Sequence, residues 1–313
     1  MSSIQTPRLS IVIVSYNVCD LVLEGISSVY KFLQFPFEII LVDNNSSDAT
    51  VNEVQEKFPE VLLISNLENK GFSFANNQGF EKCTGDLILM LNPDASLKDD
   101  SLNRMIEDYI SQKRENLFYG PKLLNKDLSF QESCWKFPNL SQHVLELFFL
   151  HTTFKLSSYK LESQIQKSRV DFLSGACILF NRSALVRLKG LDPDLFWMDD
   201  VDFCKRNLDS GGENWYYSQA SVCHLIGKSA EKNFSVVISN QLLSKLKYYR
   251  KHREFFNYIS SCFIFVLHTL SRILVFLPLS FFKPIFSKKC KAYIFTLKQI
   301  FLYFFGKKTK LSP

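Results

Sequence analysis

The sequence lacks the glycine-rich motifs with which many proteins hold phosphate groups. Neither G-x-x-x-x-G-K-[ST] nor G-x-G-x-x-G occurs in its 313 residues, so no loop of these types cradles a phosphate. The hydrolase signature G-x-S-x-G and the metalloprotease signature H-E-x-x-H are missing as well. A diphosphate bound by this chain must therefore be held mainly through a cation.

Cysteines are present, but not in the arrangements typical of a metal or redox site. The 8 cysteines include no C-x-x-C pair and no metal-ligand spacing. Several lie in apolar runs, as buried thiols in a reducing compartment do. The N-terminus shows no charged segment followed by an apolar one, which a secretory signal would have. We therefore expect the body of the protein to lie in the cytosol.

Charge is distributed unevenly along the chain. From Lys245 to the end there are 14 Lys and Arg residues and a single acid, Glu254, which gives this tail a net charge of +13, whereas the rest carries −7. The tail is also rich in Phe. A basic tail can bind nucleic acid or an anionic membrane surface. The apolar residues between the charges favour lipid and argue against nucleic acid, because they would gain nothing along a phosphate backbone.

The apolar part of the tail predicts helices. Phe255–Phe286 is interrupted by His268 and Arg272, and its longest run without Lys, Arg, Asp or Glu falls just short of a spanning length. Asn257, Ser261, His268 and Arg272 recur near helical spacing as a narrow polar stripe. Ala292–Phe305 is shorter and flanked by lysines. We favour helices that lie in the membrane interface over a spanning hairpin or a packed extension of the core.

The first hundred residues alternate short apolar runs with amphipathic segments. Leu9–Ser15 is a continuous apolar run, typical of a strand buried on both faces. The other predicted strands are Glu38–Val42, Val61–Ile64 and Asp86–Leu91, and the predicted helices are Asp20–Leu33, a helix from about Ala49 with Ser47 or Asp48 as N-cap, and Phe72–Cys83. This alternation predicts an α/β fold with a mostly parallel sheet covered on both faces.

Further along the chain the pattern is mixed. A helix is predicted at Ser101–Lys113, and Leu145–Lys167 is ambiguous. Val170–Phe180 is predicted to be another strand, interrupted by Gly175, where another group approaches the backbone closely. The predicted organisation is a domain over residues 1–244, with halves 1–95 and 96–244, followed by the basic, Phe-rich helical tail over residues 245–313.

Polar clusters follow three of the predicted strands. Ser15–Asn17 follows the first strand, Asp43–Ser46 the second, and Asn92–Asp94 the fourth. Each cluster taken alone is also typical of a turn. In a parallel sheet, however, ligands bind beyond the carboxyl ends of the strands. Three such clusters at one edge of the sheet therefore predict a ligand-binding cleft.

Two residues are candidates for holding a divalent cation. Asp94 lies just past a buried strand, on a turn stiffened by Pro93. Mg²⁺ and Mn²⁺ need few protein ligands when substrate phosphates supply the others. The alternative is that Asp94 caps a following helix. His224 is the second candidate, although a lone histidine after a strand is more often structural.

Asp199, Asp200 and Asp202 place three carboxylates within four residues, beside Phe196, Trp197 and Met198. Apolar surroundings raise the proton affinity of a carboxylate, which suits a general base. A solvated acidic loop or helix N-terminus is the alternative.

Taken in order, these segments resemble the family 2 glycosyltransferases, and within them a bacterial branch described as rhamnosyltransferase-like. The motifs that carry the resemblance are SYN, VDNNSSD, ENKGFSFANNQG, LNPDA, GPKLLN, FLSGAC, GLDPDLFWMDDVDFCKR and HLIGKS. They span about residues 9–229 in the order of the family. The resemblance implies a GT-A fold, a nucleotide-sugar donor, a divalent metal (Mn²⁺ or Mg²⁺) and inversion at the anomeric carbon.

The resemblance also assigns roles to residues. Asp94 takes the place of the last acid of the family's metal-binding D-x-D, and His224 matches a late histidine that is a metal ligand in several relatives. Asp200 matches the usual catalytic base, and Asp202 and Asp199 would orient the base or the acceptor. The donor-binding residues implied by position are Ser15, Tyr16, Asn17, Asp43, Asn69, Gly71, Phe72, Asn76 and Asn92.

The sequence departs from the family pattern at a few positions. Asp199 stands where Glu is common, and the acidic motif is one residue shorter than usual, so Asp199 is an alternative base. Phe74 occupies a position that is commonly Gly, and Glu213 lies near a position on the acceptor side that is commonly Trp.

The sequence thus predicts an inverting, metal-dependent glycosyltransferase at the cytoplasmic face of a membrane, peripheral or anchored by its tail. Its acceptor would be a glycan or a lipid-linked sugar in cell-surface polysaccharide synthesis, and the family analogy favours dTDP-rhamnose as donor. The alternatives are a sugar-phosphate nucleotidylyltransferase, which needs a basic glycine-rich loop that SYNVCD does not provide, and a non-catalytic, membrane-attached nucleotide-binding protein. The sequence carries no signal for the oligomeric state.

Overall fold

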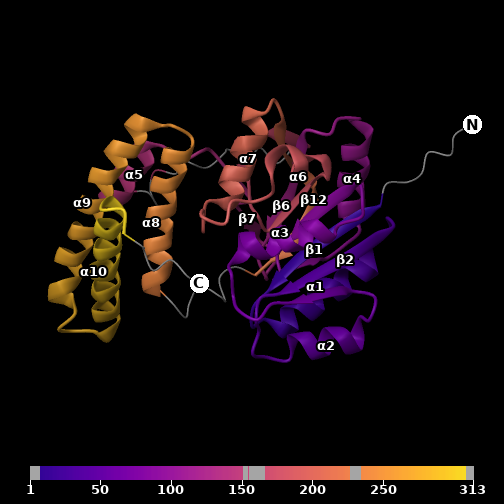
Figure 1. Ribbon diagram of the computed structural model, residues 1–313, viewed down its shortest axis with the longest axis horizontal. Helices are drawn as coiled ribbons and strands as arrows, with labels where there is room; N and C mark the ends of the chain where they lie inside the picture. Colours follow the sequence, from indigo (N-terminus) through magenta and orange to yellow (C-terminus); the bar gives the residue numbers. More distant parts are fainter. Residues whose placement is uncertain (1–7, 151–153, 155–165, 226–233, 308–313) are drawn as a thin grey trace, which may run out of the picture. The chain divides into compact units, whose positions relative to one another are not determined.

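The computed structural model describes residues 8–150, 154, 166–225 and 234–307. The chain divides into two compact units (Figure 1). The first unit comprises residues 1–136, 159–193 and 199–228, and the second comprises residues 137–158, 194–198 and 229–313. This division groups residues 137–158 and 229–244 with the C-terminal helices, whereas the sequence grouped them with the N-terminal domain.

The first unit is built on a large mixed sheet. The strands are β1 (Leu9–Ser15), β2 (Phe37–Asp43), β3 (Leu62–Ser65), β4 (Leu87–Leu91), β5 (Ala95–Leu97), β6 (Leu117–Leu124), β7 (Phe130–Gln131), β8 (Cys134–Trp135), β9 (Lys167–Arg169), β10 (Phe172–Leu173), β11 (Cys177–Asn181) and β12 (Glu213–His224). The main path of the sheet runs β3-β2-β1-β4-β11-β6-β12-β5, with β7 beside β6 and β9 beside β12.

Parallel pairing dominates the N-terminal half of the sheet. The strands β3, β2, β1 and β4 are all parallel, and Ser15 lies opposite Asp43 where β1 and β2 end. The strand β11 enters antiparallel between β4 and β6, and β12 pairs with β5 so that His224 lies opposite Ala95. The three predicted polar clusters therefore meet at one edge of the sheet.

Helices of the first unit cover both faces of this sheet (Figure 1). They are α1 (Cys19–Phe32), α2 (Thr50–Lys57), α3 (Phe72–Lys82), α4 (Ser101–Ser111), α6 (Ser183–Leu188) and α7 (Asp199–Asp209). One buried cluster, which includes Ile11 and Ile26, lies between the sheet and α1 and α4. A second cluster, which includes Val12 and Phe203, lies on the opposite face. Because alternate residues of β1 point to opposite faces, its whole apolar run is buried, as predicted.

The predicted α/β fold with a mostly parallel sheet is confirmed, but two local predictions were wrong. The N-cap of α2 is Ala49, and Asp48 instead accepts a hydrogen bond from the backbone amide of Thr50. The predicted strand Val170–Phe180 is divided at Ser174 and Gly175 into β10, which pairs with β8, and β11, which pairs with β4. The interruption at Gly175 has the predicted cause, because Asp200 approaches its backbone.

The second unit is a group of helices. They are α5 (Leu140–Leu147), α8 (Phe234–Lys251), α9 (Phe255–Leu279) and α10 (Pro284–Phe304). Its buried cluster includes Leu243, Phe265 and Ile300, so α8, α9 and α10 share one core. Arg272 of α9 is 3% exposed and donates hydrogen bonds to the backbone carbonyls of Glu146 and Leu147 at the end of α5.

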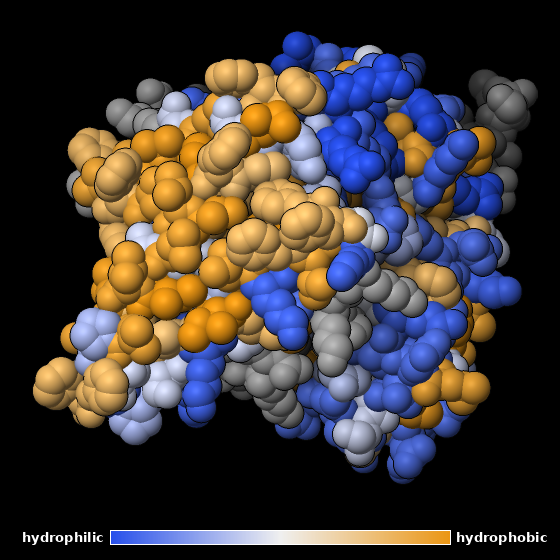
Figure 2. Space-filling view, turned by 60° about the vertical axis from the view of Figure 1, so that its left-hand side comes forward, coloured by the Kyte–Doolittle hydropathy of each residue, from blue (hydrophilic) through white to orange (hydrophobic). Residues whose placement is uncertain are grey.

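Two of the four residues of the polar stripe predicted for the tail, Ser261 and Arg272, are buried, and Asn257 and His268 are half-buried. Ser261, Thr269 and Arg272 are buried, whereas Phe255, Phe263 and many other apolar side chains of α9 are exposed. Figure 2 shows apolar side chains gathered over one face of these helices. Of the described helices, α9 is long and apolar enough to cross a membrane by length and composition, with a mean hydropathy of 2.0 in its most apolar window.

Candidate active site

Ser15 and Asp43 are joined where β1 and β2 end. The Ser15 hydroxyl donates a hydrogen bond of 3.0 Å to Asp43 Oδ1, and the backbone amide of Ser46 donates to Asp43 Oδ2. Asn17 has a positive φ of 54° and holds the neighbouring turn, because its amide oxygen accepts from the backbone of Ser47. The buried carboxylate of Asp43 is thus fixed at the sheet edge, while the side chain of Tyr16 is exposed.

Asn44 connects this edge to the segment before α3. Its side-chain amide donates to Asn69 Oδ1 at 2.8 Å and to the backbone carbonyl of Gly71. Gly71 has a φ of +90°, a backbone conformation that residues with side chains rarely adopt, and it is the N-cap of α3. Within α3, Asn76 is buried and donates to the carbonyl of Phe72. Asn69 and Gly71 therefore form one hydrogen-bonded group with Asn44, whereas Phe72 and Asn76 bond to each other within α3.

Asp94 and His224 lie side by side. Asp94 follows β4, His224 ends β12, and the backbone amide of Leu225 donates to the carbonyl of Asp94. Asp94 Oδ1 is 3.3 Å from His224 Nε2, and both side chains are largely buried. The strand β5 follows Asp94 directly, so the alternative of a helix cap at Asp94 was wrong.

The residues at this point fit a divalent cation. Adjacent ligands of an octahedral Mg²⁺ lie about 3 Å apart, which agrees with the separation of the Asp94 oxygen and the His224 nitrogen. Asn92 Nδ2 lies 3.3 Å from the same nitrogen, and its buried Oδ1 accepts no hydrogen bond within the described part of the chain. Among the described residues no group of three His, Cys, Asp or Glu could hold a metal.

Asp199 and Asp200 begin α7 next to the carboxyl end of β4. Asp200 Oδ2 accepts a hydrogen bond of 2.9 Å from the backbone amide of Gly175, and Asp200 Oδ1 accepts one from Val201. The neighbouring residue Ala176 accepts a hydrogen bond from the backbone of Asn92. Through Gly175 and Ala176, which precede β11, Asp200 is therefore held beside the residues that lead to Asp94.

Both carboxyl groups have a raised pKa. Burial raises the pKa of Asp199, and the charge of Asp200 raises it further, against a hydrogen bond from Ser73. Burial also raises the pKa of Asp200, although backbone amides of Gly175 and Val201 favour its ionised form. Asp200 is the more exposed of the two. A largely buried carboxylate with a raised proton affinity can accept a proton from a bound hydroxyl group.

Asp202 lies one turn further along α7 and has a different environment. Its buried carboxylate pairs with Arg206 at 2.7 Å, and the Arg206 guanidinium also donates to the backbone carbonyls of Leu188 and Gly190. This arrangement ties α7 to the end of α6. The described contacts of Asp202 therefore anchor the helix, and a direct role in orienting the base or the acceptor stays a prediction.

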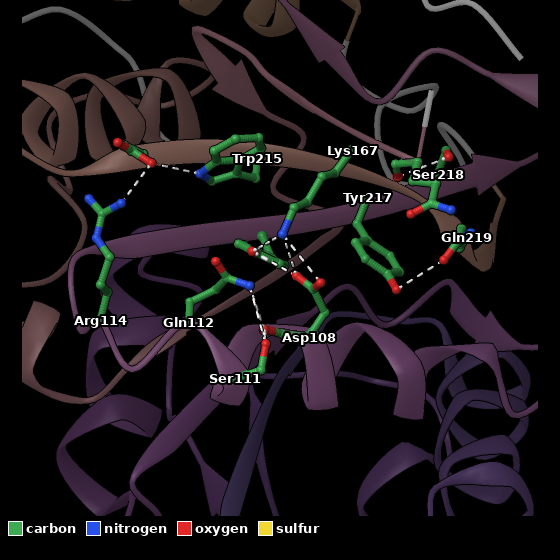
Figure 3. A network of polar contacts seen from close by, with 12 residues as sticks. Asp108, Ser111, Gln112, Arg114, Lys167, Trp215, Tyr217, Ser218 and Gln219 are labelled. Atoms are coloured by element: carbon green, nitrogen blue, oxygen red, sulfur yellow. Dashed lines mark hydrogen bonds and ion pairs between the residues drawn. The ribbon is translucent and has the colours of Figure 1, made fainter. Parts of the chain in front are cut away.

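The two side chains that depart from the family pattern, Phe74 and Glu213, have identifiable partners. Phe74 packs under the ammonium group of Lys70, which lies 5.0 Å from its ring centroid. Glu213 binds Arg114 and the indole nitrogen of Trp215, and its other oxygen binds Arg169. The side chains of Arg114 and Trp215 are labelled in Figure 3. The same view shows the ammonium group of Lys167 against the carboxylate of Asp108, a contact that joins β9 to α4. Glu213 thus belongs to a network of ion pairs on β12 and its neighbours.

Sequence reasoning missed two residues that contact the site. Ser73 lies inside the quoted motif ENKGFSFANNQG, and its hydroxyl donates to Asp199. The side-chain amide of Gln131, in β7, contacts both the imidazole ring and the backbone carbonyl of His224. The position of Ser73 two residues after Gly71 offered a weak signal, whereas a single Gln in a polar loop offered none.

Comparisons with known proteins bear on the family and the fold of the chain. The family model described as glycosyl transferase family 2 matches residues 10–188. A relative from Mycobacterium tuberculosis, described as N-acetylglucosaminyl-diphospho-decaprenol L-rhamnosyltransferase, is 26% identical over 235 residues, which cover 70% of this chain and 76% of the relative. A Bacillus subtilis protein described as the putative teichuronic acid biosynthesis glycosyltransferase TuaG is 30% identical over 39% of this chain and 49% of its own length.

Two solved structures have a similar fold at 15% sequence identity. The mannosyltransferase PcManGT of Pyrobaculum calidifontis, in complex with GDP-Man and Mn²⁺, matches with a TM-score of 0.57 over 97% of this chain and 89% of its own. GalNAc-T7 with UDP, GalNAc and Mn²⁺ matches with a TM-score of 0.54 over 80% of this chain, which spans 55% of that protein. With its GT-A-like sheet and the family match over more than half of its length, the chain belongs to glycosyl transferase family 2 and is a glycosyltransferase.

Proposed function

We propose that the chain is an inverting transferase that moves a rhamnosyl group from a nucleotide-sugar to a lipid-linked acceptor sugar. The observation that carries the proposal is the meeting of two groups at one sheet edge. Asp94 and His224 lie at the ends of β4 and β12, and Asp199 and Asp200 are held beside the same edge by Gly175. The rhamnosyl group and the lipid-linked acceptor are proposed from the description of the mycobacterial relative.

Two groups of residues at the sheet edge would hold the donor, one binding the nucleotide base and the other binding the cation at the diphosphate. In the proposal, Asp43 binds the base of the nucleotide, with Ser15, Tyr16 and Asn17 beside it. Its carboxylate is already fixed by Ser15 and Ser46, so little ordering would accompany binding. Asp94 and His224 would hold a divalent cation, which supplies positive charge to the diphosphate.

Asp200 acts as the base in this proposal. It takes the proton from the acceptor hydroxyl group while that oxygen forms a bond to the anomeric carbon. The bond from the anomeric carbon to the diphosphate oxygen breaks, and the nucleoside diphosphate leaves with the bonding electrons. Attack opposite the leaving group inverts the anomeric centre. Asp200 is preferred to Asp199 because it is more exposed and its ionised form receives two backbone hydrogen bonds.

The second unit would hold the enzyme on the cytoplasmic face of a membrane. The most exposed apolar side chains of α9, α10 and the turn between them are Phe255, Phe256, Phe263, Leu274, Phe281 and Phe282. Lys283, Lys288 and Lys289 follow closely in the sequence. Because α9 buries its polar side chains against α5 and exposes apolar ones, we propose that it lies in the membrane interface rather than spanning the bilayer.

A panel of nucleotide-sugars tests the reaction. The full chain is incubated with each donor and a polyprenyl-diphosphate-linked N-acetylglucosamine, and nucleoside diphosphate release is measured with and without Mn²⁺. Release is expected with dTDP-rhamnose only when acceptor and Mn²⁺ are both present, and the Asp200→Asn variant should show none. Release with a different sugar would refute the rhamnosyl assignment, and release by the variant at the wild-type rate would refute the base.

A further inference from the structure

Gln131 binds His224 on the side opposite Asp94. Gln131 belongs to β7, which pairs with β6 in a hairpin, and its side chain is buried. Its Oε1 lies 2.8 Å from His224 Nδ1, and its Nε2 lies 2.9 Å from the backbone carbonyl oxygen of His224. One side chain therefore contacts both the ring and the backbone of the same histidine.

The orientation of the Gln131 amide is fixed by its neighbours. A backbone carbonyl only accepts hydrogen bonds, so the atom of Gln131 facing the His224 carbonyl must be the NH₂ group. The same nitrogen donates to Asn125 Oδ1 at 2.9 Å, and Asn125 in turn donates its own NH₂ group to the hydroxyl of Ser129. A flipped Gln131 amide would place an oxygen against the carbonyl oxygen of His224.

This orientation determines where the imidazole ring carries its proton. Since Gln131 presents an oxygen to Nδ1, His224 Nδ1 must be the N–H donor. In the neutral ring the lone pair then resides on Nε2, the nitrogen that faces Asp94 Oδ1 at 3.3 Å. The buried Asn92 oxygen without a described partner lies on the same side of the ring, since its amide nitrogen is 3.3 Å from Nε2.

We propose that Gln131 is a positioning residue for the divalent cation: it holds His224 in the Nδ1–H tautomer and directs the Nε2 lone pair towards Asp94. The inference rests on the proposed function in one respect, namely that Asp94 and His224 hold the cation. When the ring nitrogen that does not bind the metal donates a hydrogen bond, the orientation of a histidine ligand is fixed and its metal-binding nitrogen becomes more basic. Gln131 thus prepares the histidine before any cation binds.

The first test needs neither cation nor substrate. The full chain, labelled with ¹⁵N-histidine and held in detergent, is studied by long-range ¹H–¹⁵N correlation at a pH where the rings are neutral. The signals of His224 are assigned with the His224→Asn variant. A protonated Nδ1 and an unprotonated Nε2 are expected. A wild-type His224 protonated on Nε2 would refute the proposal whatever reaction the enzyme catalyses.

The second test separates positioning from mere packing. Gln131→Leu keeps the volume but gives Nδ1 no acceptor. Gln131→Glu still offers an acceptor to Nδ1, yet its carboxylate cannot donate to the carbonyl of His224. If Gln131 served only the packing of the hairpin, Gln131→Glu would disturb His224 and Mn²⁺ binding at least as much as Gln131→Leu. If Gln131 positions His224, the Leu variant is the more disturbed of the two: the Nδ1–H tautomer is kept in Gln131→Glu and lost in Gln131→Leu.

Mn²⁺ binding provides the quantitative measurement. Titration of the donor-free and nucleoside-diphosphate-bound protein, followed by electron paramagnetic resonance of free Mn²⁺, should show a Kd raised about 10- to 100-fold in Gln131→Leu. In a His224→Ala background the same substitution should have no further effect. Asp127→Ala is the matched control, because it weakens the hairpin turn at Ser129 without touching His224.

The outcomes are decisive in both directions. An unchanged tautomer and unchanged Mn²⁺ affinity in Gln131→Leu, or equal losses in the Asp127→Ala control, would overturn the positioning role. Failure of every donor in the panel would instead overturn the proposed reaction while leaving the tautomer result standing. The two failures are therefore distinguishable.

Discussion

The hydroxyl group of Ser73 donates a hydrogen bond of 3.0 Å to the carboxylate of Asp199, across 126 positions of sequence. Ser73 lies in the first turn of α3, two residues after Gly71, whereas Asp199 begins α7. Both side chains are buried. This hydrogen bond connects the start of α3, which is proposed to bind the donor, with Asp199 and Asp200, which are proposed to activate the acceptor.

Substitution of Ser73 by Ala should change both stability and the pH profile. A buried carboxylate that loses its donor costs about 1–3 kcal/mol, so the free energy of unfolding should fall by that order. The Ser73 hydrogen bond lowers the pKa of Asp199, so its loss should move the ionisation of Asp199 to higher pH. Denaturant unfolding and the pH dependence of transfer measure the two effects. Ser73→Thr keeps a hydroxyl group, so its stability and its pH profile should be close to those of the wild type. An unaltered pH profile in Ser73→Ala would show that the Ser73 hydrogen bond does not influence the ionisation of Asp199.

The pH dependence of transfer should identify the base. Burial raises the pKa of both carboxyl groups, and the charge of Asp200 brings that of Asp199 to about 7. Asp200 ionises first, and a base works only when ionised, so the rate should rise with pH above the ordinary range of an aspartate. A second, smaller rise is expected near pH 7, as the charge of Asp199 strengthens the base.

The Asp199→Asn variant provides the contrast. It should retain transfer and lose the rise near pH 7, because only Asp200 remains to titrate, whereas Asp200→Asn should be inactive. The measurement is kcat/KM between about pH 4 and pH 9 at fixed ionic strength. Activity in Asp200→Asn combined with inactivity in Asp199→Asn would assign the base to Asp199.

Gly175→Ala should impair transfer more than folding. A Cβ atom at this position would lie 3.3 Å from Asp200 Cβ and 3.5 Å from Asp200 Oδ2. The backbone amide that binds Asp200 would remain, so the carboxylate would be displaced by a few tenths of an ångström rather than released. Because a displacement of about 1 Å can cost about 100-fold, we expect kcat to fall severalfold. Gly211→Ala is unsuitable as a control because Gly211 has a φ of +80°, so Val186→Ala on α6 serves instead.

Much of the first unit could be predicted from the sequence. The strands β1, β2 and β4 are apolar runs buried on both faces, and their predicted ends agree with the structure to within about one residue. Asp43 and Asp94 could be placed at the sheet edge because parallel strands end together. Local pattern sufficed for these strands because both of their faces are buried and each connection is short.

Other features depend on partners that the local sequence does not specify. Gly175 signalled a close approach, but only the tertiary structure shows that it divides Val170–Phe180 between two sheets. Gln131 reaches His224 because β7 pairs with β6 while β12 pairs with both β6 and β5. The direction in which the polar stripe of the tail points could not be predicted, because the carbonyls that Arg272 binds lie 125 and 126 positions earlier in the sequence.

The exposed apolar face of the second unit should bind lipid. Phe281 and Phe282 are 85% and 81% exposed, and basic residues follow them from Lys283. Replacing both by Ser removes apolar area that would contribute up to about 2 kcal/mol for each ring, so the partition coefficient onto vesicles should fall at least about tenfold. Co-sedimentation of the full chain with phosphatidylglycerol–phosphatidylcholine vesicles measures it. Removal of the tail after Lys245 is less informative, because that cut lies inside α8.

The control for this prediction lies in the first unit. Leu67 and Val186 are 98% and 84% exposed, so Leu67→Ser and Val186→Ser remove comparable apolar area from a surface that is not proposed to touch lipid. These variants should sediment like the wild type. Binding should also weaken as salt rises or as phosphatidylglycerol is withdrawn, because the basic residues gain only from an anionic surface. If the Phe281→Ser/Phe282→Ser protein sediments as fully as the control variants, the apolar face does not dock on the membrane, and a different surface must bring the enzyme to a lipid-linked acceptor.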